Sequence, residues 1–214
     1  NGTGIQQAAR ARESIKTEGS KAVALLDDNT SYSKDITTRA AENLEKEGIQ
    51  VVNKQSVTAG ESDYSGAVTA VLKAKADFVY WTGYYQEGGL LIKQLRAAGY
   101  TGKIMVADGS VDKQLVDIAG EANAQGVFAT MTQTPSTIPG GEKWIADYKA
   151  KFNADPGPYS TQSYDAVRVA AISTVTPTFA SEVVEMPDIA TDSAAAAAVD
   201  THRFRASIPL KAYE

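Results

Sequence analysis

The chain has 214 residues, a net charge of −5, 43% apolar and 22% charged residues, and no basic stripe. These totals are typical of a globular protein with a sizeable core and argue against a nucleic-acid partner, and no apolar run reaches the roughly 18 residues of a membrane span. Because there is no cysteine and only one histidine, His202, we expect no metal site, no cofactor and no enzyme.

Five short apolar segments are predicted strands, at residues 21–26, 49–56, 77–82, 103–107 and 126–131. Between them, apolar residues recur with helical spacing in segments 36–44, 66–72 and 90–98. The residues on these three predicted apolar faces are Ile36, Ala40, Ala41 and Leu44, then Ala67, Val68, Val71 and Leu72, then Leu91, Ile92, Leu95 and Ala98. Gly48 and Gly99 stand where two of the helices should end.

Strands alternating with helices over short connections predict an α/β fold, a doubly wound parallel sheet flanked by helices. In such sheets ligands bind beyond the carboxyl ends of the strands. The segments that follow three of these strands place Tyr32, Tyr84, Tyr85 and Asp108 along one rim of the predicted sheet, the rim formed by the carboxyl ends of its strands. Aromatic rings and a carboxylate suit a small ligand with an apolar body and an ammonium group. The structural alternative is that the rings pack in the core and that Asp108 caps a helix.

Other functions fit the residues less well. A phosphoacceptor receiver domain would use the acidic pair Asp27 and Asp28, but it needs a carboxylate after the third strand, and Asp77 lies at the leading end. A dinucleotide-binding enzyme would need a third glycine in the segment GTGIQQ at residues 2–7. A hydrolase would need a G-x-S-x-G turn, which the sequence does not contain.

Several longer stretches carry a resemblance to a known family. They are AVALLDDNTSYSKD, VTAGESDYSGAV, ADFVYWTGYYQEGGLLIKQLRAAG, IMVADGS and DIAGEANAQGVFATM, in order from residue 22 to 131. In these stretches the chain resembles the periplasmic branched-chain amino-acid-binding proteins, the type I solute-binding proteins of ABC transporters, mainly in their second lobe. A weaker similarity continues to Ala171.

The resemblance implies a non-catalytic receptor in which two lobes close on an amino acid. It implies that Tyr32, Tyr84 and Tyr159 line the pocket and that Asp108, where leucine-binding relatives usually carry Glu, binds the α-ammonium group. Tyr85 is then expected to begin the helix that follows the third strand. It also implies a membrane permease as partner and a periplasmic or extracellular location, with a lipid anchor as an option for a full-length form. A sensing domain of a receptor or regulator is the alternative role of such a lobe.

The resemblance also implies a domain plan. Residues 1–131 correspond to the second lobe, 132–171 to the crossing back toward the first lobe, and 172–214 form an unmatched tail with some helix near 193–199. No stretch resembles the loops that bind the ligand's carboxylate in the first lobe. We therefore expect a partial receptor of low affinity, with self-association as an option where the first lobe is absent.

Overall fold

The computed structural model describes residues 4–175, which form two compact units that divide between Thr134 and Pro135. Each unit is described by itself. The segment 176–214, with His202 and the helix expected near 193–199, lies outside the described residues.

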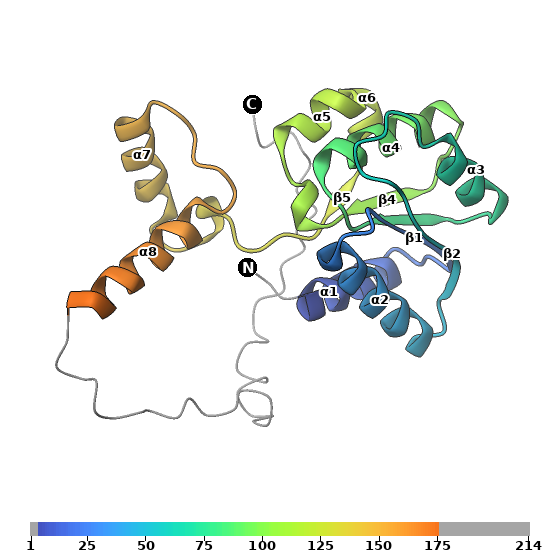
Figure 1. Ribbon diagram of the computed structural model, residues 1–214, viewed down its shortest axis with the longest axis horizontal. Coiled ribbons are helices and arrows are strands. Elements are labelled where there is room, and N and C mark those ends of the chain that lie inside the picture. The colour runs from blue at the N-terminus through green and yellow to red at the C-terminus, as the bar shows by residue number, and fades with distance from the viewer. Residues whose placement is uncertain (1–3, 176–214) are drawn as a thin grey trace. The chain divides into compact units, whose positions relative to one another are not determined.

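The first unit is built on one five-stranded sheet (Figure 1). Its strands are β1 (Ala22–Asp27), β2 (Gln50–Ser56), β3 (Phe78–Trp81), β4 (Lys103–Val106) and β5 (Phe128–Ala129), in the order β2-β1-β3-β4-β5. Every neighbouring pair is parallel, which confirms the predicted doubly wound α/β fold. The chain leaves β1 for β2 at one edge and then returns to β3 on the other side of β1. The topological switch therefore lies at the carboxyl ends of β1 and β3.

Helices cover both faces of this sheet (Figure 1). On one face are α1 (Gly4–Thr17) and α2 (Ser31–Lys46); on the other are α3 (Ser65–Lys73), α4 (Tyr85–Ala97), α5 (Lys113–Ala119) and α6 (Glu121–Ala124). Successive strand residues alternate between the two cores: Val23 and Leu25 pack with α1 and α2, and Ala24 and Leu26 pack with the other helices. The central strands are apolar except at their ends, at Asp27 in β1 and Lys103 in β4, because both faces of the sheet are covered.

The predicted apolar helix faces and the predicted length of the last strand were wrong at some positions. Leu72 and Ala98 are exposed, because each lies at the end of its helix, where the apolar stripe has already turned away from the sheet. Strand β5 has only two residues, since the turn at Gly126, with φ of +76°, precedes it and the strand lies at the sheet edge. Strand β2 forms the other edge and is only half-buried, which explains its polar residues.

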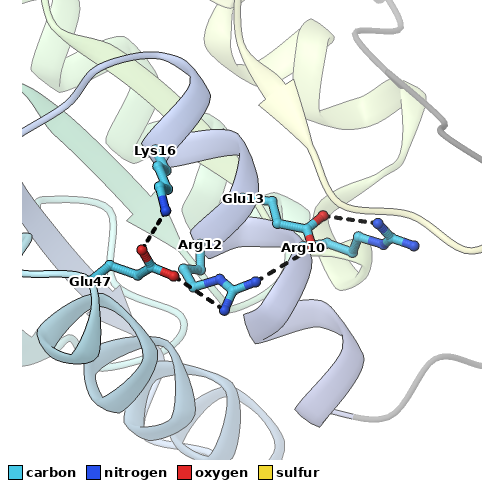
Figure 2. Close-up of polar contacts among 5 residues, drawn as sticks. All are labelled: Arg10, Arg12, Glu13, Lys16 and Glu47. Atoms are coloured by element: carbon cyan, nitrogen blue, oxygen red, sulfur yellow. Dashed lines mark hydrogen bonds and ion pairs between the residues drawn. The ribbon is translucent and has the colours of Figure 1, made fainter. Parts of the chain in front are cut away.

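Helices α1 and α2 are also joined at their surface by ion pairs (Figure 2). Glu47, just after α2, accepts hydrogen bonds from Lys16 Nζ at 2.6 Å and lies 3.5 Å from Arg12 Nη1. Lys16, and to a smaller extent Arg12, hold the pKa of Glu47 below its usual value. Glu13 bridges Arg12 to Arg10 along α1. Because these groups are substantially exposed, the core contacts between the helices matter more for stability than the ion pairs do.

The second unit contains a 3-10 turn (Pro135–Thr137), α7 (Gly141–Phe152) and α8 (Ser160–Val175). Aromatic rings hold the two helices together. The Trp144 ring lies edge-on to Tyr164 of α8, with centroids 6.2 Å apart, and also contacts Tyr148 at 5.3 Å. Helix α8 runs past Ala171, where the family resemblance in the sequence ended.

A cluster of buried hydroxyl groups connects α2 to the end of β3 through hydrogen bonds. Ser33, Thr37 and Thr82 are all fully buried. The Thr82 hydroxyl lies 2.8 Å from Thr37 Oγ1 and contacts two backbone carbonyl oxygens, of Leu26 at 3.2 Å and of Ser33 at 3.0 Å. Buried hydroxyls are stable only when hydrogen-bonded, so this cluster fixes the start of α2 relative to the sheet.

We expect the isosteric variant Thr82→Val to lower the free energy of unfolding, because Ser33 and Thr37 lose a buried partner. The loss should be about 1–3 kcal/mol. Urea denaturation measures it, with Thr101→Val as control, since Thr101 is exposed and should shift stability by less than about 0.5 kcal/mol. Equal stability of the two variants would show that the hydroxyl cluster contributes nothing.

Candidate functional site

The loop after β1 determines where Tyr32 stands. The Asp28 carboxylate accepts hydrogen bonds from the backbone N–H of Thr30 at 3.0 Å and from its hydroxyl at 2.7 Å. Thr30 in turn caps α2 by accepting from the backbone N–H of Ser33 at 3.3 Å. Helix α2 therefore begins at Ser31, and Tyr32 lies in its first turn, at the carboxyl end of the sheet.

The loop after β3 presents Tyr84. Trp81, at the end of β3, donates a hydrogen bond from its indole N–H to the carbonyl oxygen of Tyr84 at 2.9 Å. The indole lies so close beneath the loop that a Cβ at Gly83 would come within 2.3 Å of it. Tyr84 is 44% exposed, and its ring lies against that of Tyr32, with centroids 5.7 Å apart and planes at 34°. The buried tryptophan thus supports the exposed Tyr84, whose ring packs on the half-buried ring of Tyr32.

The loop after β4 brings in Asp108. Asp108 opens a short 3-10 turn (Asp108–Ser110) and is only 7% exposed. Its Oδ1 atom accepts a hydrogen bond from the Tyr32 hydroxyl at 2.5 Å, and the backbone N–H of Gly109 donates to the same hydroxyl at 3.3 Å. The Ser110 hydroxyl donates to the carbonyl oxygen of Gly83 at 2.8 Å. Three separate strand ends are thereby joined, and Tyr32, Tyr84 and Asp108 lie together as predicted.

The surroundings of Tyr32 keep its hydroxyl protonated. Burial raises the pKa of Tyr32 well above its ordinary value, and its hydrogen bond to Asp108 and the negative charge there raise it further. Donors from Gly109 and Gln7 oppose this rise in the pKa but do not cancel it. Tyr32 is therefore a neutral hydrogen-bond donor to a carboxylate at every physiological pH.

The other two tyrosines lie apart from this cluster of three residues. Tyr85 is the first residue of α4 and packs, half-buried, against the core, which confirms the prediction that it begins this helix. Tyr159 belongs to the second unit, where it is half-buried just before α8 and its carbonyl oxygen accepts from the backbone N–H of Ser163 at 3.0 Å. Its role in a pocket stays a prediction.

Sequence reasoning missed Gln7. This residue is 7% exposed, and its side-chain oxygen accepts hydrogen bonds from the backbone N–H of Asp108 and from the Thr130 hydroxyl, both at 3.4 Å. A signal was present: Gln7 shares the buried face of α1 with Ala8, Ala11 and Ile15, where an amide is out of place among apolar residues. Buried amides need specific partners, so the helical periodicity alone could have marked Gln7.

Asp77 has a structural role at the amino ends of the strands, the end of the sheet opposite the rim. Its carboxylate accepts hydrogen bonds from the backbone N–H groups of Lys21 at 2.8 Å and Ala22 at 3.2 Å. It therefore holds the start of β1 and lies away from the rim. Within residues 4–175, no three acidic or histidine side chains are grouped so as to hold a metal ion. Nor is any helix in this range both long and apolar enough to cross a membrane.

Comparison with known proteins shows the family to which the chain belongs. A family model described as "Periplasmic binding protein" matches residues 1–201. The chain belongs to the periplasmic binding protein family. The match extends beyond Ala171, into residues that the structure does not describe.

Two curated members of the family show how much of such a protein the chain covers. The leucine-, isoleucine-, valine-, threonine-, and alanine-binding protein of Pseudomonas aeruginosa is 34% identical over 152 residues, which are 71% of this chain and 40% of that protein. The Leu/Ile/Val-binding protein of Escherichia coli K12 is 31% identical over 146 residues, which are 68% of this chain and again 40% of that protein. The chain thus spans about 40% of the length of these relatives.

Solved structures of the family have the same fold. The leucine binding protein LivK from Thermotoga maritima superposes with a TM-score of 0.72 and 30% identity, over 80% of this chain and 50% of that one. The substrate binding protein LivJ of Streptococcus pneumoniae, solved with isoleucine, gives a TM-score of 0.67 at 24% identity, over 78% of this chain and 49% of that one. These similarities confirm the predicted doubly wound α/β fold.

We expect stability to fall with rising pH in the alkaline range. Burial raises the pKa values of Tyr32, Tyr80 and Tyr100 above the ordinary value of 10.0. The unfolded chain therefore loses protons above about pH 10 that the folded chain keeps, so this contribution to stability is complete below pH 10 and declines above it. Urea midpoints at about pH 8 and about pH 11 measure the decline.

The variant Tyr32→Phe tests the part that Tyr32 contributes. It should be less stable at about pH 8, having lost the hydrogen bond to Asp108, but its stability should fall less steeply above about pH 10. An unchanged slope would contradict the assignment of a raised pKa to Tyr32.

Proposed function

We propose that this protein is the extracytoplasmic solute-binding component of an ABC transporter and that it captures an amino acid with a branched or other apolar side chain. The observation that carries the proposal is the buried Asp108 carboxylate beside the ring pair of the half-buried Tyr32 and the exposed Tyr84, at the topological switch of the sheet. The names of the curated relatives, which bind leucine, isoleucine and valine, support the choice of ligand.

The chemistry of the rim fits a ligand of this kind. Asp108 supplies a negative charge that pairs with an α-ammonium group through charge-assisted hydrogen bonds. The rings of Tyr32 and Tyr84 supply apolar surface for the side chain and attract a nearby cation through their faces. No nucleophile or general base is needed for this task, which is binding and release without a reaction.

The rim provides only one half of the contacts that an amino acid needs. The α-carboxylate requires cationic or N–H donors, and neither Tyr32 nor Asp108 offers one to it. We propose that the unit ending at Thr134 is one of two lobes, that the second unit leads toward the other lobe, and that closure between the lobes encloses the ligand. Tyr159 is proposed to line the pocket from the second unit.

The same proposal names the partner and the place of action. A membrane permease recognises the closed form, and the protein works in the periplasm or outside the cell. Use of the same lobe for ligand sensing is the alternative, and binding of the ligand-loaded protein to a permease would distinguish the two roles.

We expect L-leucine to bind and Asp108→Asn to weaken that binding, since the variant removes the charge that pairs with the ammonium group. The loss should be about 1.5–3 kcal/mol, which is at least about tenfold in Kd. Chemical-shift titration measures it even at low affinity. Asp112→Asn is the matched control, because Asp112 follows on the same loop and caps α5, a task that Asn performs equally well. Unchanged affinity in Asp108→Asn would rule out the ammonium contact.

We expect Tyr84→Ala to weaken L-leucine binding by about three- to tenfold, through loss of aromatic contact area, and Tyr84→Phe to bind like the wild type. Stability should hardly change, because Trp81 contacts the backbone of Tyr84 and the side chain is largely exposed. The same titration gives both affinities. Equal binding by Tyr84→Ala and wild type would remove Tyr84 from the site.

A further inference from the structure

Ser110 is a fully buried serine in the loop after β4. The 3-10 turn that opens at Asp108 places it there, and its backbone N–H donates to the carbonyl oxygen of Ala107 at 3.0 Å. Its hydroxyl donates to the carbonyl oxygen of Gly83, in the loop after β3, at 2.8 Å. The backbone ladder between β3 and β4 reaches Ala107, whose N–H donates to the Trp81 carbonyl oxygen at 2.8 Å. The Ser110 hydroxyl therefore extends the connection between these two strands into their loops.

Gly83 has no side chain that could hold its loop in place, and the packing around it leaves no room for one. A Cβ atom at Gly83 would lie 2.3 Å from the indole ring of Trp81, which is itself buried. A Cβ atom at Gly109 would lie 3.3 Å from the Gly83 carbonyl oxygen, so glycine at that position lets the loops after β3 and β4 approach each other closely. The position of the loop after β3 therefore depends on hydrogen bonds to its backbone.

The two peptide groups on either side of the Tyr84 Cα atom are both hydrogen-bonded. The Gly83 oxygen belongs to the peptide plane before Tyr84 and accepts from Ser110. The Tyr84 oxygen belongs to the plane after it and accepts from the indole N–H of Trp81 at 2.9 Å. Because peptide groups are planar, fixing both planes also fixes the direction of the Tyr84 Cα–Cβ bond. That direction brings the Tyr84 ring onto the ring of Tyr32, with centroids 5.7 Å apart.

We propose that Ser110 is a positioning residue of the rim, whose hydrogen bond to Gly83 sets the direction of the Tyr84 side chain and so the place of the ring that the ligand meets. Ser110 is fully buried, so it acts through Tyr84 and not by contact with the ligand. Without its hydroxyl, the peptide plane before Tyr84 gains freedom to rotate, and the exposed ring takes up more positions. Ordering that ring when the ligand binds then costs conformational entropy. This inference deepens the proposed function and rests on it for the identity of the ligand.

The two peptide planes report on Ser110 without any ligand. The backbone N–H of Tyr84 lies in the plane of the Gly83 carbonyl group, and the N–H of Tyr85 lies in the plane of the Tyr84 carbonyl group. From nitrogen-15 relaxation we expect order parameters of about 0.85 for both N–H groups in the wild type. In Ser110→Ala the value for Tyr84 should fall toward about 0.6, while the value for Tyr85 should stay, because the Trp81 indole still holds its plane.

The same measurement separates positioning from a general loosening of the fold. A flexible Tyr84 N–H in the wild type would overturn the proposal, and so would an unchanged Tyr84 value or an equal fall for Tyr84 and Tyr85 in Ser110→Ala. Ser20→Ala is the matched control, because it also removes the hydroxyl of a buried serine, but one that precedes β1 at the amino ends of the strands. It should leave the Tyr84 value as in the wild type, and a fall there as large as in Ser110→Ala would also contradict the proposal.

A titration with L-leucine then connects the peptide plane to binding. We expect Ser110→Ala to weaken L-leucine binding by about fivefold in the wild-type background and by less than about twofold in a Tyr84→Ala background, where no ring remains to be positioned. Equal losses in both backgrounds would overturn the positioning role, as would unchanged affinity in Ser110→Ala. Absence of L-leucine binding to the wild type would instead count against the proposed function, while the order parameters of Tyr84 and Tyr85 still decide whether Ser110 holds the Tyr84 backbone.

Discussion

The hydrogen bond from the Tyr32 hydroxyl to the Asp108 carboxylate is the contact on which the rim depends. It joins the loop after β1 to the loop after β4, and in the sheet these strands lie on either side of β3. Tyr84, which follows β3, is thereby held between them with its ring against Tyr32. A hydrogen bond to a charged acceptor in a partly buried place is strong, and loss of either partner leaves the other poorly solvated. The bond therefore couples the three loops into one surface.

This surface is precise because rigid elements carry it. On one side of β3, the hydroxyl groups of Thr82 and Thr37 hold the first turn of α2, which contains Tyr32. On the other side, the Trp81 indole supports the backbone at Tyr84. Both supports are buried at the end of the same strand, so they fix the two backbone segments that carry the rings. Site residues whose backbone is supported by buried, hydrogen-bonded neighbours keep their geometry better than residues on unsupported loops.

The sequence predicted the sheet and its flanking helices well, since both depend on local patterns. Alternating apolar strands and periodic helices were enough for β1, β3, β4, α2 and α4, and the glycines after α2 and α4 mark their ends. The sequence patterns were weaker where a helix or strand is short or lies at an edge of the sheet. Strand β5 was expected to be longer, and α5 and α6 were not predicted, because a helix of four to seven residues has too few turns to show a period.

The site was predictable only in part, for a different reason. The rule that ligands bind at carboxyl strand ends, together with the family resemblance, brought Tyr32, Tyr84 and Asp108 together. This rule did not lead to Gln7. Helical periodicity could have marked Gln7 as a polar residue on a buried face, but its partners Asp108 and Thr130 lie 101 and 123 residues away along the chain. Contacts of this separation depend on the completed fold, so periodicity does not identify the partners. Tyr159 lies in the second unit, and its role in a pocket stays a prediction.

In the proposed function, the burial of the rim residues would also orient the ligand. Asp108 is nearly buried, Tyr32 is half-buried, and Tyr84 is the most exposed of the three. In the proposed complex, an ammonium group that pairs with Asp108 therefore lies deepest, with the apolar side chain of the ligand against the rings nearer the surface. The α-carboxylate of this ligand points away from Asp108, because like charges repel. The groups that bind this carboxylate then come from outside the rim, which is the chemical reason for proposing closure by a second lobe.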